Sequence, residues 1–211
     1  MESFGRVRIL GDSYSTFAGW IPQDYAAFYG PGIGSVDAVE KTWWHRLLRE
    51  TGSELLRNGS YSGTTVCNTG YDGCYCPDIS FVGRVQRDLT EPEGPTDTVL
   101  VFGGTNDSWA GSPVGEPCYE GWTEEALRSF APAFCYLLAY LGTYVPEARV
   151  VVLINTELRP EIAEAMAEIG RHYGAEVVRL RDIEKAEGHP TARGMEQIKD
   201  QVLEVLGRAA E

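Results

Sequence analysis

The chain has 211 residues, of which 43% are hydrophobic, 11% aromatic and 23% charged, a composition typical of a single globular domain spanning residues 1–211. No apolar run approaches the roughly 18 residues that a membrane-spanning helix needs, so we expect a soluble protein. The formal net charge of −13 and the lack of a Lys and Arg cluster exclude partners with a phosphate backbone. We therefore expect neither nucleic acid nor a membrane surface as a partner.

The first ten residues form a charged, strand-like segment and not a basic stretch followed by an apolar run. This pattern differs from that of a secretory signal peptide, so we expect a cytoplasmic protein. A secreted protein that has lost its signal peptide would have the same sequence, and that alternative stays open.

Short apolar runs alternate with helical patterns from one end of the chain to the other. The expected strands cover residues 7–10, 54–57, 98–102, 149–154 and 176–180. Helical patterns cover residues 42–50, 80–89, 123–144, 159–173 and 192–209. This alternation predicts an α/β fold with a central, mostly parallel sheet of five strands and helices on both of its faces.

Two long segments, residues 14–39 and 60–78, are rich in Gly, Tyr, Asn and Pro and match neither pattern. Each of them follows an expected strand. In open parallel sheets the loops at the carboxyl ends of the strands form the ligand-binding crevice. These segments therefore predict a functional site at that edge of the sheet.

A candidate nucleophile follows the first strand, in the tripeptide Gly11-Asp12-Ser13. The same tripeptide is common in ordinary turns, so it is weak evidence by itself. Its position at the carboxyl edge of the sheet makes Ser13 a candidate catalytic serine.

Two further candidates follow the next strands along the chain. Gly63 comes after the second strand, where a glycine lets the backbone approach a ligand and present its N–H. Asn106 lies in the segment Gly103-Gly104-Thr105-Asn106-Asp107 after the third strand. A backbone N–H beside an amide side chain is typical equipment for stabilising an oxyanion.

The chain has three histidines. His45 falls in an expected helix beside Trp43 and Trp44, which we interpret as core residues, and His172 falls at a helix end, where a cation is favourable. His189 lies between the last strand and the last helix, at the edge where the serine is expected. It is therefore the candidate general base.

The order of these four motifs resembles that of the SGNH (GDSL) hydrolase family, and the resemblance spans the chain. It implies a three-layer α/β/α, flavodoxin-like sandwich. Ser13, Gly63, Asn106 and His189 match the four residues that give the family its name. The resemblance implies a serine-dependent ester hydrolase that uses an acyl-enzyme and needs no cofactor.

One position departs from the family pattern, which usually has an aspartate three residues before the histidine to complete a triad. Here that residue is Ala186, which cannot orient an imidazole. Glu184, Glu187 and Asp182 are nearby candidates for the orienting acid, and a backbone carbonyl is the alternative. Loss of the acid costs large factors in rate in related triads.

We expect a small-molecule or carbohydrate ester as the substrate, with a short acyl group, because the loops are rich in aromatic rings that suit sugars and acyl chains. Trp109, Tyr14 and Asp107 are the substrate-binding candidates. Two alternatives stay open: a weak or inactive carbohydrate-binding relative, favoured by Ala186, and a thioesterase or lysophospholipase. The oligomeric state is not predicted.

Five cysteines are an odd number in a chain too large to need a disulfide framework, so we expect mainly free thiols. They are Cys67, Cys74, Cys76, Cys118 and Cys135. The first three do not have the spacing of the usual zinc-binding pairs, so no metal is expected. A disulfide within the first three, or to Cys118, stays open.

Overall fold

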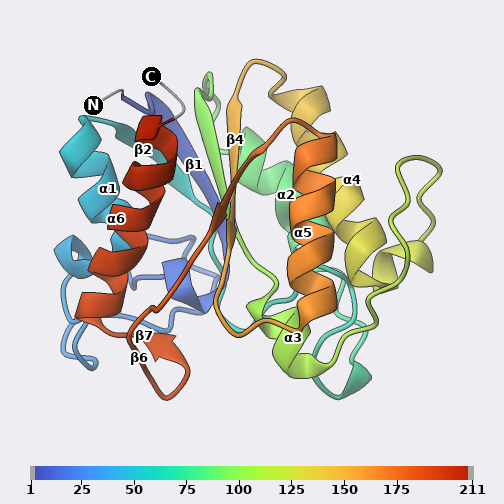
Figure 1. Ribbon diagram of the computed structural model, residues 1–211, viewed down its shortest axis with the longest axis horizontal. Helices are drawn as coiled ribbons and strands as arrows, with labels where there is room; N and C mark the ends of the chain where they lie inside the picture. The colour runs from blue at the N-terminus through green and yellow to red at the C-terminus, as the bar shows by residue number, and fades with distance from the viewer. Residues whose placement is uncertain (1–2, 209–211) are drawn as a thin grey trace.

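The computed structural model describes residues 3–208, and a central sheet lies between two layers of helices (Figure 1). Its five parallel strands have the order β2-β1-β3-β4-β5. They are β1 (Arg6–Gly11), β2 (Glu54–Asn58), β3 (Thr98–Phe102), β4 (Arg149–Ile154) and β5 (Glu176–Arg179). The predicted three-layer α/β/α fold is confirmed, and each strand matches its expected range to within one residue at either end.

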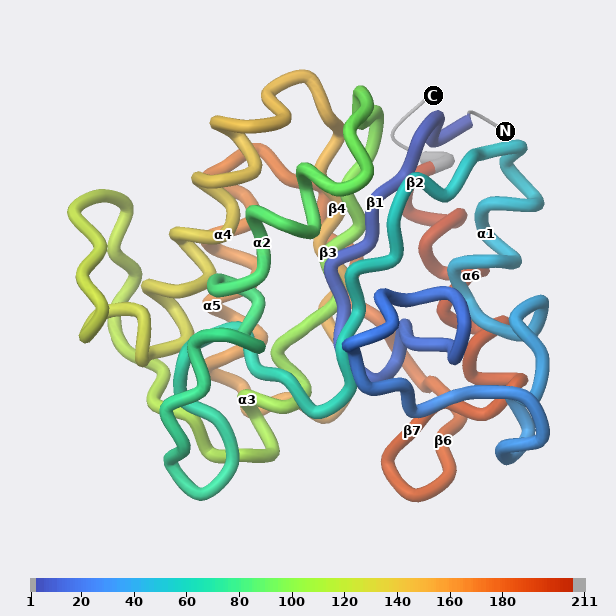
Figure 2. Tube along the Cα trace, turned by 180° about the vertical axis from the view of Figure 1, so that it is seen from behind, coloured from blue at the N-terminus to red at the C-terminus, as the bar shows by residue number. Residues whose placement is uncertain are grey.

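Five helices form the two outer layers. One layer contains α1 (Trp43–Thr51) and α6 (Ala192–Arg208). The other contains α2 (Phe81–Thr90), α4 (Phe130–Tyr144) and α5 (Pro160–His172). The views from the front and from behind show the two layers on opposite sides of the sheet (Figures 1 and 2). Four of these helices match their predicted ranges closely, although the expected last residue, Ala209, lies outside the described residues. Within residues 3–208 no helix combines the length and the apolar sequence that a membrane span requires.

The helix expected over residues 123–144 is wrong at its start, because α4 begins only at Phe130. A separate 3₁₀ helix, η4 (Ala126–Arg128), precedes it, and Ser129 between the two is extended. The backbone N–H groups of Phe130 and Ala131 donate to the carbonyls of Pro113 and Val114, at 2.8 and 2.7 Å. The loop thus satisfies the first amides of α4, which have no partner inside a helix, and fixes where the helix begins.

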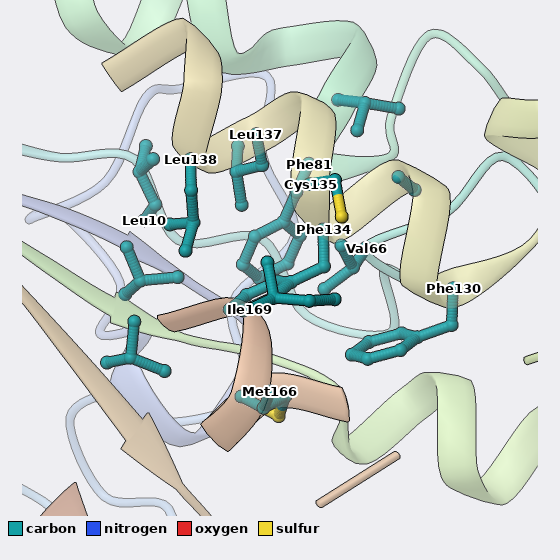
Figure 3. Packing of buried hydrophobic residues seen from close by; sticks show 14 of the residues in the cluster. Leu10, Val66, Phe81, Phe130, Phe134, Cys135, Leu137, Leu138, Met166 and Ile169 are labelled. Carbon is teal, nitrogen blue, oxygen red and sulfur yellow. The ribbon is translucent and has the colours of Figure 1, made fainter. Parts of the chain in front are cut away.

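The two faces of the sheet bury separate cores. The core under α2, α4 and α5 contains Phe81, Phe134 and Met166 (Figure 3). The core under α1 and α6 contains Trp43 and Trp44, both fully buried, which confirms their interpretation as core residues. Burial of a large apolar side chain stabilises a fold by roughly 1.5–3 kcal/mol, so these clusters hold the helices firmly against the strands.

Short elements gather where the strands end. They are the 3₁₀ helices η1 (Ser13–Ser15), η2 (Val39–Lys41) and η3 (Tyr71–Gly73), the helix α3 (Thr105–Ala110), and a hairpin of β6 (Lys185–Ala186) with β7 (His189–Pro190). Figures 1 and 2 place α3 and the hairpin at the same end of the molecule. Neither was predicted as a regular element, since we expected loops there.

The cysteines divide into one bonded pair and three free thiols. Cys74 and Cys76 form a disulfide in the segment that follows η3. Cys67, Cys118 and Cys135 are free. Of the two disulfide alternatives left open by the sequence, the structure therefore shows the bond within the first three cysteines and not a bond to Cys118.

Candidate active site

Ser13 and His189 lie side by side although 176 positions separate them in the chain. Ser13 is the first residue of η1, just after β1, and His189 is the first residue of β7. The Nε2 atom of His189 is 3.0 Å from the Oγ atom of Ser13. At this distance the imidazole can accept the hydroxyl proton, as a general base for a serine nucleophile must.

The turn that carries Ser13 is fixed by its two preceding residues. Asp12 caps η1, because its Oδ1 atom accepts a hydrogen bond of 3.1 Å from the N–H of Tyr14. Gly11 has no room for a side chain, since a Cβ there would lie 2.8 Å from the Cβ of Ser15. These contacts position the turn, and Ser13 within it is nearly buried, with 2% of its surface exposed.

The other ring nitrogen of His189 meets a backbone carbonyl. Its Nδ1 atom is 3.3 Å from the carbonyl oxygen of Glu187. The carboxylate of Glu184 is engaged elsewhere, where it accepts a hydrogen bond from the hydroxyl of Thr191, and the side chain of Asp182 is exposed. Among the described residues none of the three candidate acids bonds the imidazole through its carboxylate, so the backbone alternative is the one observed.

This contact assigns the tautomer of His189. The Nδ1–H group donates to the carbonyl, which leaves Nε2 free to accept the proton of Ser13. Burial lowers the pKa of His189 below its ordinary value, and the nearby Lys185 lowers the pKa further, although the Glu187 carbonyl acts in the opposite direction. The imidazole is therefore neutral at neutral pH, as a base must be.

Aromatic rings surround His189. Phe28 stacks on the imidazole, with ring centroids 3.6 Å apart and planes 7° apart. Tyr14 and Trp109 contact it at steeper angles, at 5.4 and 5.6 Å. Sequence reasoning missed Phe28, for which the only signal was its place in the long loop 14–39.

The structure separates the substrate-binding candidates. Trp109 is 46% exposed beside His189, where a substrate can reach it. Tyr14 is fully buried, and its hydroxyl donates to the carbonyl of Gly188, so it holds the hairpin in place and does not present a surface to a ligand. The expectation of substrate contact by Tyr14 is therefore wrong.

Asp107 is also no substrate contact, contrary to expectation. It is fully buried, and its two carboxylate oxygens accept hydrogen bonds from the N–H groups of Val66 and Cys67, at 2.8 and 3.2 Å. Burial raises its pKa to about 6. Asp107 therefore fixes the loop that follows β2.

Asn106 and Gly63 reach the same edge of the sheet as Ser13. Gly11 at the end of β1 pairs with Phe102 at the end of β3. Ser13 comes two residues after Gly11, and Asn106 comes four residues after Phe102, so both lie just beyond the same edge of the sheet. Gly63 follows β2, the other neighbour of β1, and its φ of +79° is one that glycine adopts readily. In the described structure no residue accepts a hydrogen bond from its N–H.

The amide of Asn106 is held on both sides. Its Nδ2 atom donates to the carbonyl of Thr64 at 3.0 Å, and its Oδ1 atom accepts from the hydroxyl of Tyr71 at 2.7 Å. The amide nitrogen carries two hydrogens, so one remains for a ligand. Sequence reasoning missed Tyr71, because nothing in an irregular loop indicates where a tyrosine will point.

A buried arginine in α2 bonds the backbone at the carboxyl ends of β1 and β2. Arg84 in α2 donates to the carbonyl oxygens of Gly11, at 2.8 Å, and of Gly59, and it pairs with Asp88 at 2.8 Å. These three contacts are buried. The signal in the sequence is an Arg and Asp pair four residues apart on a helix that also carries the apolar residues facing the sheet.

Comparisons with known proteins agree with this arrangement. A family model described as GDSL-like lipase/acylhydrolase matches residues 5–206. A crystal structure named as that of a GDSL-like lipase from Bacteroides uniformis is 49% identical, with a TM-score of 0.91, covering 97% of this chain and 96% of that one. A second, from Bacteroides ovatus, is 39% identical, with a TM-score of 0.92 and coverage of 98% and 100%.

A more distant structure has the same fold. It is named as a carbohydrate esterase whose active site displays divergent catalytic and non-catalytic binding functions. It is 16% identical, with a TM-score of 0.65, and the match covers 99% of this chain and 70% of that one. No curated protein matched the sequence.

Proposed function

Because the chain belongs to the GDSL-like lipase/acylhydrolase family, we propose that it is a serine-dependent ester hydrolase that works through an acyl-enzyme. The observation that carries the proposal is the 3.0 Å separation between Ser13 Oγ and His189 Nε2. Family membership supports a hydrolase, and this contact supports the serine mechanism.

The reaction has two halves. Ser13 Oγ attacks the ester carbonyl carbon while His189 Nε2 takes the hydroxyl proton, and His189 then gives that proton to the leaving alcohol as the C–O bond breaks. A water molecule next loses a proton to His189 and attacks the acyl-enzyme. The acid leaves, and the proton returns to Ser13 Oγ.

The oxyanion formed in each half needs hydrogen-bond donors. The donors in our proposal are the N–H groups of Ser13 and Gly63 and the free N–H of the Asn106 amide. Within the described residues neither backbone N–H has an acceptor. Donors already held in place, as the Asn106 amide is, cost no reorganisation when charge develops.

We assign a short acyl group on a carbohydrate as the substrate class. Trp109, which is 46% exposed, lies beside His189. Flat aromatic faces suit sugar rings. The structural similarity to a named carbohydrate esterase supports the same class.

Hydrolysis of p-nitrophenyl acetate tests the mechanism. Ser13→Ala should lower kcat/KM by roughly a thousandfold or more, because it removes the nucleophile. Ser62→Ala is the matched control, since Ser62 lies in a neighbouring loop and its backbone N–H donates to the carbonyl of Ala26, a bond that alanine keeps. Equal rates for the Ser13→Ala variant and the unmodified protein would refute the proposal.

The acyl chain length is tested separately. In a series of p-nitrophenyl esters from acetate to laurate, kcat/KM should be highest for the shortest chains. An optimum at laurate would instead favour a lysophospholipase.

A carbohydrate-binding protein with weak or no catalysis is the second candidate. The observation that favours it is the neutral carbonyl at His189 Nδ1, where a triad has a charged acid. Calorimetric titration with xylo- and cello-oligosaccharides separates the two functions. Binding that Trp109→Ala abolishes, together with no turnover of any acetylated oligosaccharide, would favour the binding protein.

A further inference from the structure

We propose that Phe28 is a positioning residue for His189, and that its ring performs part of the work that a triad carboxylate performs elsewhere. It holds the plane of the imidazole and stabilises the imidazolium that forms during proton transfer. This inference rests on the proposed function, because it assigns a role in the same reaction.

The stacking geometry carries the proposal. The Phe28 and His189 rings are nearly parallel, 3.6 Å apart between centroids, whereas Tyr14 and Trp109 meet the imidazole at 56° and 64°. Among these rings only Phe28 covers a face of the imidazole. A ring lying flat on that face blocks rotation of the imidazole away from Ser13. The face of an aromatic ring also attracts a cation, which favours the protonated imidazole.

Phe28 is built into the nucleophile turn. Its N–H donates to Thr16 Oγ1 at 2.9 Å, and the same hydroxyl donates to the carbonyl of Ser13 at 3.0 Å. The next residue, Tyr29, donates through its hydroxyl to the carbonyl of Pro190 at 2.8 Å. The backbone that carries the Phe28 ring is thus tied both to the nucleophile and to the strand that carries the base.

The electrostatic surroundings show why this help is needed. Lys185 in β6 is a cation near His189, and it pairs with Glu157 at 3.2 Å. The hydroxyls of Tyr14 and Tyr29 face the hairpin but donate to backbone carbonyls. The Nδ1 atom of His189 meets only the neutral carbonyl of Glu187. Among these groups no carboxylate bonds the imidazole, so the π face of Phe28 adds to the neutral Glu187 carbonyl in stabilising its charge.

Two variants isolate the aromatic face. Phe28→Leu keeps an apolar side chain that excludes water but removes the ring, and Phe28→Tyr keeps the ring. The first readout is the pKa of His189 from its NMR signals, followed without substrate. The chain has only three histidines. The signal that disappears in His189→Gln is the signal of His189.

Phe28→Leu should lower the pKa of His189, shift its ring signals through loss of the ring current, and reduce kcat on p-nitrophenyl acetate about tenfold with KM changed less than twofold. Phe28→Tyr should keep the pKa of His189, the ring-current shift and kcat close to those of the unmodified protein. An unchanged pKa of His189 in Phe28→Leu would overturn the proposal, whatever the rate of hydrolysis. A rise in KM with no change in kcat would also overturn it, because that result marks a substrate contact. The titration needs no turnover, so it tests the contact between Phe28 and His189 even if ester hydrolysis by Ser13 is disproved.

Discussion

At the scale of single residues, the proposed nucleophile is flanked by a buried acid that the proposed mechanism does not use. Asp12 is fully buried beside Ser13, and burial raises its pKa to about 7, although the hydrogen bond from the N–H of Tyr14 acts in the opposite direction. Asp107 adds a further upward contribution. Asp12 is therefore partly protonated at neutral pH.

This pKa predicts how stability depends on pH. The folded-state value lies above the ordinary 3.8, so the folded chain holds a proton that the unfolded chain releases. This contribution to stability is complete below about pH 4 and is lost as the pH rises through 7. Asp12→Asn, which keeps the capping oxygen, removes it.

Between pH 8 and pH 6 the unmodified protein should gain about 1 kcal/mol of unfolding free energy relative to Asp12→Asn. Urea denaturation at both pH values measures the difference. The comparison cancels the opposite contribution of His189, which both proteins share. The same difference between the two proteins at both pH values would contradict the assignment.

Tyr71 is predicted to support the oxyanion site. Tyr71→Phe removes the hydroxyl that donates to Asn106 Oδ1, so the amide loses one of its two fixed contacts. We expect kcat to fall about tenfold with little change in KM, because the amide acts mainly in the transition state.

Tyr75→Phe is the matched control for Tyr71→Phe. Tyr75 lies in the same loop, and its ring keeps its contact with Arg128 after the change. Steady-state kinetics on p-nitrophenyl acetate compares the two variants. Equal effects of the two would mean that Tyr71 only maintains the loop.

At the scale of elements, α2 supports the ends of β1 and β2 through Arg84. Arg84→Met leaves Asp88 and the carbonyls of Gly11 and Gly59 without this buried donor. Breaking a buried ion pair by removing one partner costs roughly 3–5 kcal/mol. We expect a loss of unfolding free energy toward the lower end of this range in urea denaturation, because Asp88 keeps its ion pair with Arg57 at 3.1 Å.

Arg87→Met is the control on the same helix. Arg87 pairs with Asp24 at the surface, where an ion pair contributes less than about 1 kcal/mol. Similar losses for the Arg84 and Arg87 variants would contradict the supporting role of Arg84.

Elements with a regular pattern were predictable and those set by local contacts were not. β3 is buried along its whole length, so its apolar run identifies it directly. The start of α4 depends on the carbonyls of Pro113 and Val114, which lie in the loop between α3 and η4 and show no helical pattern. The short helix α3 begins after Gly104 and has too few residues to show a period.

At the scale of the whole molecule, the parallel topology explains why much of the site could be predicted. Strands in one parallel sheet end at one edge, so the order of motifs along the chain brings Ser13, Asn106 and His189 to that edge. Phe28 and Tyr71 could not be predicted in the same way. Their positions depend on irregular loops that fold against the completed sheet.

Activation of Ser13 by His189 is tested most directly by the rate of labelling with a fluorophosphonate, measured by intact mass and peptide mapping. At neutral pH the unmodified protein should gain one adduct, located on Ser13, and His189→Ala should react roughly a hundredfold more slowly or not at all. An unlabelled protein, an adduct on another residue, or equal rates for the two proteins would contradict this mechanism.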